Sequence, residues 1–505
     1  MRRKLAMTNV TTRILFQVVT MLSGFVVQRL LIGCFGSPLV GLTASITKFL
    51  GFITLLEAGM GRVVVAALYK PLADADNKRI NSVHKSSNSF FRKIALILLV
   101  YIVVLGLALP RVTDVFGLGK GYTFLLTVVI GLSSIMQYYF GITNQLLLEA
   151  DQRQYIPNLL STLCAFANAF VVIVLVRVNA DIIYIKLLSS IVLIIKPAFL
   201  YIYCRKKYNL NKDNCSNEDG LEQKWAGLGH HIAYFVHTST DVTLLTIMGQ
   251  YSNVSVYTLY TMITGSLTSI IDCVSSGIQA AFGNIIAKNE VAVLNRSFNV
   301  FETIIHLTVT VVFGTAGLMI IPFISIYTRG IADVEYILPL FGYFVVLQEG
   351  MFCLRRPYIT IIEAAGHYKQ TQCFAYAEAI TNIVISVILV KPYGLVGIVL
   401  GTFIAMTLRT ICSVLYLRKN ILNRPLLEFL KCIIADATAV IIVAVIYSKF
   451  LSQYADGNYY IWAGIAALTV MLLFAFSCGM HWIFHKDSMK CVFQEVMSTI
   501  KVLKK

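Results

Sequence analysis

The chain has 505 residues, of which 57% are hydrophobic and only 13% are charged, with a formal net charge of +17. A soluble protein carries about twice that charged fraction, so the composition excludes an ordinary soluble protein. The basic excess lies mainly in the polar loops between apolar runs, which is typical of cytoplasmic loops near anionic lipid and not of nucleic-acid binding. We therefore expect a membrane environment and no nucleic-acid partner.

Apolar runs of about 20 residues recur from end to end, each long enough to cross a bilayer as a helix. We predict an all-α polytopic membrane protein whose fourteen spans cover roughly residues 12–35, 39–67, 91–113, 121–149, 156–178, 182–204, 226–250, 254–287, 297–327, 333–364, 372–391, 393–417, 428–451 and 458–485. Lys and Arg gather in alternate loops, which places both termini in the cytoplasm.

The first six spans form a predicted N-terminal lobe, residues 1–210, with ionisable residues inside apolar runs. Arg29 lies in the first span, Lys48 and Glu57 in the second, and Lys196 in the sixth. Such residues are costly in lipid and usually face a cavity or a partner.

A polar loop, residues 211–225, joins this lobe to a predicted C-terminal lobe, residues 226–420. The intramembrane ionisable residues of the second lobe are Asp241, Asp272, Glu349, Arg355, Arg356 and Arg409. Pro357 follows the two adjacent arginines, and we expect it to kink the tenth span there. Residues 421–505 add two further spans and a basic tail, for which the sequence gives no role.

The two lobes match as an internal repeat when the sequence is shifted onto itself. One shift places Glu149 on Glu363 and Asn168 on Asn382, and a shift greater by one position places Glu57 on Asp272. Matching positions are separated by six spans, so both copies have the same orientation in the membrane. A parallel repeat of this kind suggests a transporter with its substrate site between the lobes and alternating access. The duplication also removes the need for a dimer, so we expect a functional monomer.

The intramembrane charges predict an anionic substrate. Basic residues outnumber acidic ones in this set, and guanidinium groups match the oxygens of phosphate. The predicted cationic cavity consists of Arg29, Lys48, Lys196, Arg355, Arg356 and Arg409. The alternative for the adjacent arginines is an intramembrane salt bridge, for example from Arg356 to Glu349.

The acidic residues Glu57, Asp241, Asp272 and Glu349 are candidates for gating or for binding a coupling ion. A buried carboxylate with a raised pKa suits a proton, and helix-to-helix hydrogen bonding is the alternative role. We expect no cofactor, with transport driven by an H⁺ or Na⁺ gradient or by the membrane potential. The cysteines show no CxxC pair and no Cys/His spacing typical of a metal site, so no metal is predicted.

The stretch from residue 29 to residue 80 resembles the polysaccharide transporters, the Wzx-like O-antigen and capsule flippases, of the multidrug/oligosaccharidyl-lipid/polysaccharide (MOP) exporter superfamily. The similarity rests on four motifs: Gly36 to Leu42, Leu56 to Gly61, Ala67 to Ala73, and Asp76 to Ile80. It implies a MATE/MOP-like fold and transfer of an undecaprenyl-diphosphate-linked oligosaccharide to the outer leaflet of the bacterial inner membrane. Polysaccharide polymerases or glycosyltransferases of the same pathway are the implied partners.

Two other classes compete with this prediction. A drug exporter of the same fold should have a less cationic, more acidic and more aromatic cavity. A membrane enzyme acting on the same lipid usually needs catalytic residues on a large outer loop, and the predicted outer loops are short. No phosphate-binding glycine loop is present. A non-enzymatic transporter is therefore the favoured interpretation.

Overall fold

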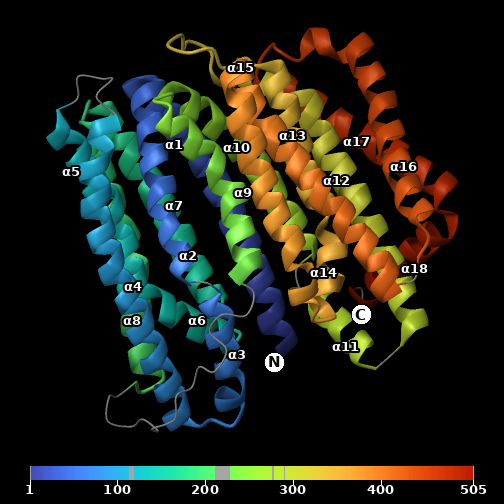
Figure 1. Ribbon diagram of the computed structural model, residues 1–505, viewed down its shortest axis with the longest axis horizontal. Helices are drawn as coiled ribbons and strands as arrows, with labels where there is room; N and C mark the ends of the chain where they lie inside the picture. Colours follow the sequence, from blue (N-terminus) through green and yellow to red (C-terminus); the bar gives the residue numbers. More distant parts are fainter. Residues whose placement is uncertain are drawn as a thin grey trace. The chain divides into compact units, whose positions relative to one another are not determined.

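The computed structural model describes residues 2–57, 59–112, 119–210, 228–275, 278–288, 290–422 and 424–503. The predicted loop 211–225 lies outside these residues. The described residues are almost entirely helical and contain no strand. They divide into two compact units, unit 1 (residues 1–258) and unit 2 (residues 259–505) (Figure 1).

Unit 1 is a bundle of long apolar helices. Its elements are α1 (Arg2–Leu50), α2 (Thr54–Glu57), α3 (Met60–Ala73), α4 (Asn77–Val112), α5 (Lys120–Met136), the π-helical turn η3 (Gln137–Gly141), α6 (Ile142–Ala150), α7 (Tyr155–Arg177), α8 (Ile182–Lys207), α9 (Leu228–Ile247) and the first turns of α10 (Tyr251–Ser275). Helix α1 packs along α7, and α5 packs between α4 and α8. Side chains such as Leu42, Ile46 and Leu98 are fully buried in this core.

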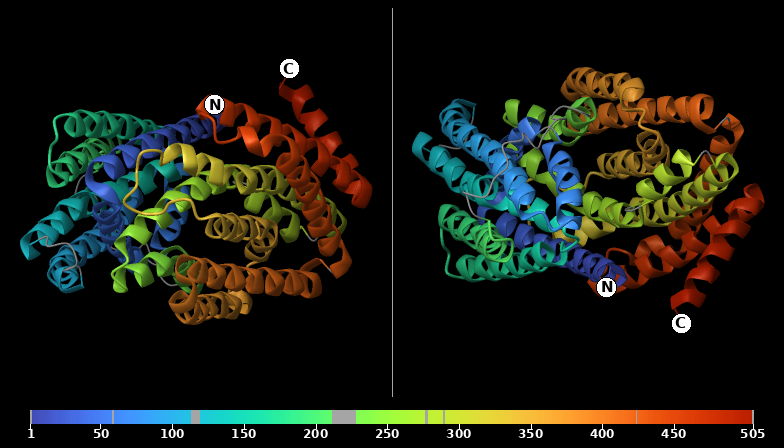
Figure 2. Two further views of the ribbon diagram at one scale, coloured as in Figure 1. Left: turned by 90° about the horizontal axis from the view of Figure 1, so that it is seen from above. Right: turned by 90° about the horizontal axis from the view of Figure 1, so that it is seen from below.

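Unit 2 continues with α10 and is built around one central helix, α12. Its further elements are α11 (Ile278–Ala287), α12 (Val291–Tyr327), α13 (Pro339–Leu354), α14 (Arg356–Ala364), α15 (Tyr368–Leu417), α16 (Leu426–Ile446), α17 (Tyr459–Phe484) and α18 (Lys486–Leu503). Helix α12 packs against α13 and also against α16, α17 and α18, drawn in red in Figure 2.

The predicted spans map onto these helices. Within the described residues, ten helical stretches are long and apolar enough to cross a membrane. Two of them hold a pair of predicted spans, because α1 is kinked at Gly36 and α15 at Gly394. Both glycines have a positive φ, which side chains with a Cβ rarely adopt. Helix α9 and the pair α13–α14 lie where the other two spans are predicted, outside those ten stretches. The predicted all-α membrane fold class is confirmed.

The backbone repeats with the offset found in the sequence. Positive φ angles occur at Gln152 and Gly366, which follow the matched glutamates Glu149 and Glu363 by the same number of positions. Positive φ angles also occur at Asn179 and Gly394. The distance along the sequence between these two residues exceeds the repeat offset of the glutamates by a single position. Each pair marks the same type of helix connection, so the two copies turn the chain at equivalent points.

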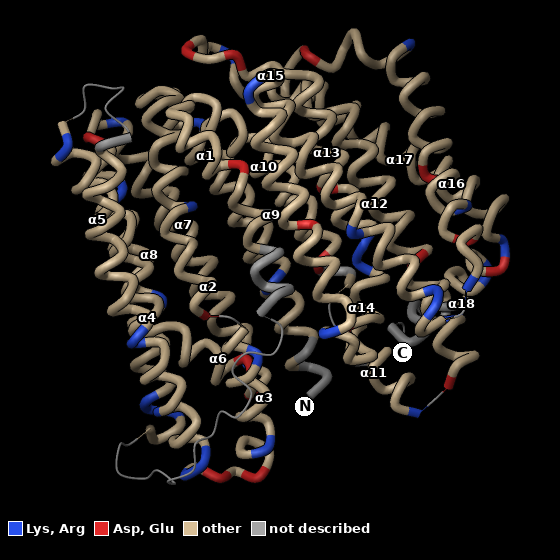
Figure 3. Tube along the Cα trace, in the orientation of Figure 1, with Lys and Arg blue, Asp and Glu red and all other residues tan. Residues whose placement is uncertain are grey.

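Basic residues gather at one end of unit 1. Figure 3 shows them where the C-terminal ends of α3 and α8 and the N-terminal end of α4 meet. This end carries Lys70, Lys78, Arg79, Arg205 and Lys206. Anionic lipid headgroups would favour such a surface, and it is the end predicted to face the cytoplasm.

Candidate functional site

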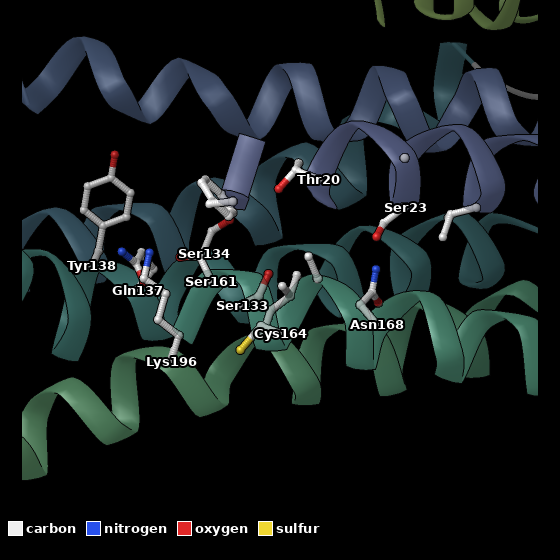
Figure 4. A pocket seen from close by; sticks show the side chains of 15 residues that line it. Thr20, Ser23, Ser133, Ser134, Gln137, Tyr138, Ser161, Cys164, Asn168 and Lys196 are labelled. Atoms are coloured by element: carbon white, nitrogen blue, oxygen red, sulfur yellow. The ribbon is translucent and has the colours of Figure 1, made fainter. Parts of the chain in front are cut away.

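Unit 1 contains a partly open cavity of about 510 Å³, lined by residues of α1, α5, η3, α7 and α8. Its wall is lined by Phe16, Thr20, Ser23, Gly24, Val27, Ser133, Ser134, Gln137, Tyr138, Ser161, Cys164, Ala165, Asn168, Leu193 and Lys196. Thr20 and Ser23 extend from α1 toward α5 and α7, and Lys196 reaches up from α8 toward Gln137 (Figure 4). The π-helical turn at Gln137 belongs to a class of helix irregularity that is frequent at functional sites.

The polar groups on the cavity wall are mainly small hydroxyl side chains and one cation. Lys196, predicted as a substrate-binding residue, lies on the wall and is half-buried. Within the described part of the chain it forms no ion pair. A lone ammonium group in a poorly solvated space attracts an anion, and the neighbouring hydroxyl groups can donate hydrogen bonds to anionic or sugar oxygens.

The other predicted cations of unit 1 lie on α1, outside the cavity wall. Arg29 is half-buried, about half a turn beyond the lining residue Val27. Lys48 is exposed near the end of α1, and its Nζ donates to the carbonyl oxygen of Thr238 on α9 at 3.1 Å. Lys48 therefore links two helices of the unit through a backbone acceptor.

Two predicted acidic residues of unit 1 accept hydrogen bonds from tyrosines. The Tyr138 hydroxyl, on the cavity wall, donates to Glu57 Oε2 at 3.4 Å. Asp241 is almost fully buried, and the Tyr257 hydroxyl donates to its Oδ2 at 2.7 Å. Glu57 is thus linked to the cavity wall through Tyr138, whereas Asp241 links α9 to α10 through Tyr257.

In unit 2, two of the predicted arginines share one carboxylate. Arg355 Nη1 lies 2.7 Å from Glu378 Oε1, and Arg409 Nη1 donates to Glu378 Oε2. The exposed fractions of Arg355, Glu378 and Arg409 are 3%, 2% and 7%. These three residues, termed the ion triad, join the α13–α14 junction to both halves of α15.

Arg356 has a different and more open environment. Its Nη2 lies 2.6 Å from Asp272 Oδ1, and about a third of each side chain is exposed. The guanidinium also stacks over the Phe352 ring, 4.6 Å from its centroid. Glu349, considered above as the partner of Arg356, instead accepts a hydrogen bond from the Thr268 hydroxyl at 3.3 Å.

The different partners follow from the adjacent positions of the two arginines. Helix α13 ends at Leu354 and α14 begins at Arg356, with Pro357 in its first turn. Arg355 keeps helical φ and ψ, and neighbouring side chains on a helix point about 100° apart. The predicted interruption next to Pro357 is present, and the two arginines point toward separate carboxylates.

Sequence reasoning missed Glu378 and most of the cavity wall. Glu378 is an intramembrane carboxylate in the apolar run AYAEAITNIV, and that signal alone could have added it to the candidates. Ser, Thr and Gln in apolar helices are too common to mark a cavity before the helices are assembled.

No family model matches the chain, and no curated protein is significantly similar to it. Solved structures do match. The lipid II flippase MurJ in an inward closed conformation superposes with a TM-score of 0.69 at 14% identity, over 96% of this chain and 99% of that chain. An inward-facing multidrug resistance MATE family transporter of the MOP superfamily has a TM-score of 0.59 at 17% identity, over 81% and 97%. The chain has the same fold as these two solved structures.

A third MOP-fold match is the MATE multidrug transporter DinF-BH, whose structure contains a bound compound. Its TM-score is 0.57 at 16% identity, over 83% of this chain and 95% of that chain. The resemblance seen in the sequence is therefore confirmed at the level of the fold. Sequence identities of 14–17% to these structures establish the fold and not the substrate.

Proposed function

We propose that the protein is a flippase for a lipid-linked oligosaccharide. The substrate is an undecaprenyl-diphosphate-linked glycan for O-antigen, capsule or exopolysaccharide synthesis. It would move from the cytoplasmic to the outer leaflet of the bacterial inner membrane by alternating access, with both termini of the chain in the cytoplasm. Polymerases or glycosyltransferases of the same pathway are the proposed partners of a functional monomer.

One observation carries the choice among MOP-fold functions. The likeness to the lipid II flippase covers 96% of this chain, whereas the likenesses to the two MATE transporters cover 81% and 83%. A lipid-linked substrate has a long apolar tail as well as a polar headgroup, so an extended apolar surface suits it better than it suits a small drug.

The cations have unequal roles in this proposal. Lys196, in a cavity with hydroxyl-bearing walls, is a direct contact for the diphosphate or for the first sugar. Arg356, partly exposed and paired with a partly exposed acid, can exchange Asp272 for a phosphate. Arg29 and Lys48 are proposed as further contacts.

Arg355 and Arg409 are proposed to act indirectly. Both are buried against Glu378, and removing either from that carboxylate would leave an uncompensated buried charge. Their role is then to fix the α13–α14 break that presents Arg356.

The driving force is proposed to act through the acidic residues. Glu57 is linked to the cavity wall and Asp241 is buried beside Tyr257, so protonation or Na⁺ binding at either would change the charge balance of unit 1. Glu349 and Asp272 are the corresponding candidates in unit 2. No cofactor is needed for this scheme.

The test is binding of an undecaprenyl-diphosphate oligosaccharide to the purified protein in liposomes. Lys196→Ala and Arg356→Ala should each weaken binding by about tenfold or more, the worth of a hydrogen bond to a charged group. Lys186→Ala is the matched control, because Lys186 lies on the same helix, α8, but is not part of the cavity wall. It should bind like the unaltered protein.

Two results would contradict the proposal. Binding that is equally strong without the diphosphate would remove the anionic group from recognition. Binding of cationic dyes in place of the lipid would favour the drug-exporter function of the MATE transporters, for which DinF-BH is the structural precedent.

A further inference from the structure

A second polar cluster lies in unit 2, where the C-terminal helices meet α12. It brings together Glu302 and His306 of α12, Cys432 of α16, and His485 at the junction of α17 and α18. Their exposed fractions are 1%, 0%, 1% and 6%. None of these residues belongs to the cavity or to the ion triad. These four side chains are potential metal ligands, and they are buried together among further charged and polar side chains.

Three of the ligand atoms are close enough to share one ion. Single donor atoms of Glu302, His306 and Cys432 all lie within 4.8 Å of one another. His485 adjoins this group through Cys432, with its Nε2 3.4 Å from Cys432 Sγ. Ligands around a tetrahedral zinc ion at bond lengths of about 2.0–2.3 Å are separated by between three and four ångströms, so side-chain movements must draw the three donors together and bring His485 Nε2 to the same ion.

Both histidines are oriented as metal ligands usually are. Nδ1 of His306 lies 2.5 Å from Asp436 Oδ2, and Nδ1 of His485 lies 3.4 Å from Glu428 Oε2. Each ring therefore has a carboxylate at Nδ1. Nε2 of His485 lies 3.4 Å from Cys432 Sγ, and Nε2 of His306 lies 3.5 Å from the Tyr358 hydroxyl, which donates to Glu302. A carboxylate behind the distal nitrogen is the common arrangement in histidine-bound metal sites.

Counted with neutral histidines, the charges of the cluster leave one negative charge in excess. Three carboxylates, on Glu302, Glu428 and Asp436, face two permanently cationic side chains. These are Arg424, 2.5 Å from Glu302 Oε2, and Lys431, 3.1 Å from Glu428 Oε1. A divalent ion with a Cys432 thiolate would offset the remaining negative charge. Glu302 can ligate and keep its bonds to Arg424 and to the Tyr358 hydroxyl, because each carboxylate oxygen has two lone pairs.

We infer that Glu302, His306, Cys432 and His485 form a closed site for a zinc-like divalent ion that fastens α16 and the α17–α18 junction to α12. Thiolate, imidazole and carboxylate together suit Zn²⁺ better than the hard ions Mg²⁺ or Ca²⁺. Four protein ligands leave no open position, so the ion is structural. The sequence hides this site because its ligands are scattered between Glu302 and His485, without the short spacing that marks common zinc motifs.

The competing explanation is a metal-free hydrogen-bond network. His481 Nε2 also lies 2.9 Å from Asp436, at Oδ1, and the Cys432 thiol can donate directly to His485. The two explanations differ in what the thiol does, because only a coordinated sulfur is held as a thiolate at neutral pH.

The first test uses the unaltered, full-length protein in detergent. After chelator treatment it is titrated with Co²⁺ alone, and the thiolate-to-cobalt absorption band in the near ultraviolet is recorded. We expect about one ion per chain, displaced by Zn²⁺. Absence of the band, with the protein eluting as a folded species, would overturn the proposal without any variant.

The variants then locate the ion. Cys432→Ser should abolish the band, whereas Cys204→Ser, which removes an equally buried thiol from unit 1, should leave it unchanged. Glu428→Gln changes no ligand but removes the carboxylate behind His485, which also pairs with Lys431, and should weaken affinity by about tenfold. Persistence of the band in Cys432→Ser, or its loss in Cys204→Ser, would place the ion elsewhere and contradict the assignment.

Discussion

The ion triad predicts a large and specific loss of stability when Glu378 is neutralised. Glu378→Gln keeps the volume of the side chain but removes the negative charge that Arg355 and Arg409 share. All three residues are less than a tenth exposed, so solvent screens their charges little. Breaking a buried ion pair on one side costs about 3–5 kcal/mol, and here two cations lose the same partner.

That loss is a large part of the total stability of a folded protein, which is about 5–15 kcal/mol. The measurement is thermal unfolding of the detergent-purified protein, followed by helical signal and by gel-filtration behaviour. Glu290→Gln changes the same residue type at an exposed position before α12 and should stay within about 0.5 kcal/mol of the unaltered protein.

A compensated variant separates charge from packing. Replacing Glu378, Arg355 and Arg409 together by Met removes every charge of the triad, and such replacements are often neutral or stabilising. The reasoning would be refuted if Glu378→Gln unfolded within about 1 kcal/mol of the unaltered protein, a normal variation for a point substitution. It would also be refuted if the triple variant were as unstable as the single one.

Three further predictions concern unit 1. Gly41→Ala should cost about 1–3 kcal/mol or more, because the new methyl would lie 1.8 Å from the carbonyl oxygen of Tyr251; Gly33→Ala, with no atom within 4 Å, is the neutral control. Asp181→Ala removes the N-terminal cap of α8 and should cost about 1 kcal/mol, measured by thermal unfolding. Burial and the Asp151 carboxylate raise the pKa of Tyr208, so this tyrosine ionises at a lower pH in the unfolded chain than in the folded protein. The free energy of unfolding should therefore fall as the pH rises above about 10, and Tyr208→Phe should reduce that fall.

Much of the fold could be predicted because lipid leaves few choices. An apolar run in a bilayer must satisfy its backbone within a helix, so length and composition alone determine the spans. The repeat offset was visible because Glu149 and Asn168 have polar counterparts in an apolar background. The kinks at Gly36 and Gly394 follow from backbone angles that other residues avoid.

Side-chain partners could not be predicted in the same way, because they depend on contacts between distant helices. Arg356 was considered with Glu349 on one helical face, yet Arg356 pairs with Asp272 and Glu349 accepts from Thr268, both on the neighbouring helix α10. Glu378 lies on the helix that follows α14 and pairs with Arg355 only because α13 packs against α15. Lys196 was identified from its charge alone, whereas the hydroxyl groups around it come together only when four helices are assembled.

The repeat also explains why Arg409 of unit 2 has a carboxylate partner, whereas the equivalent Lys196 of unit 1 lies on the cavity wall. The distance along the sequence from Cys164 to Glu378 equals the repeat offset that relates Glu149 to Glu363. The distance from Lys196 to Arg409 is shorter by a single position. Cys164 therefore corresponds to Glu378, and Lys196 to Arg409, on equivalent helices of the two copies. Unit 2 has a carboxylate at this position and closes into an ion triad, whereas unit 1 has a thiol and leaves Lys196 on a cavity wall.

If Lys196 binds the anionic substrate, Cys164→Glu should supply the missing carboxylate and occupy the ammonium group, and binding in liposomes should fall by about tenfold or more. Cys164→Gln has the same shape without the charge and should retain binding more fully. Equal binding by the two variants would mean that Lys196 does not meet the anion.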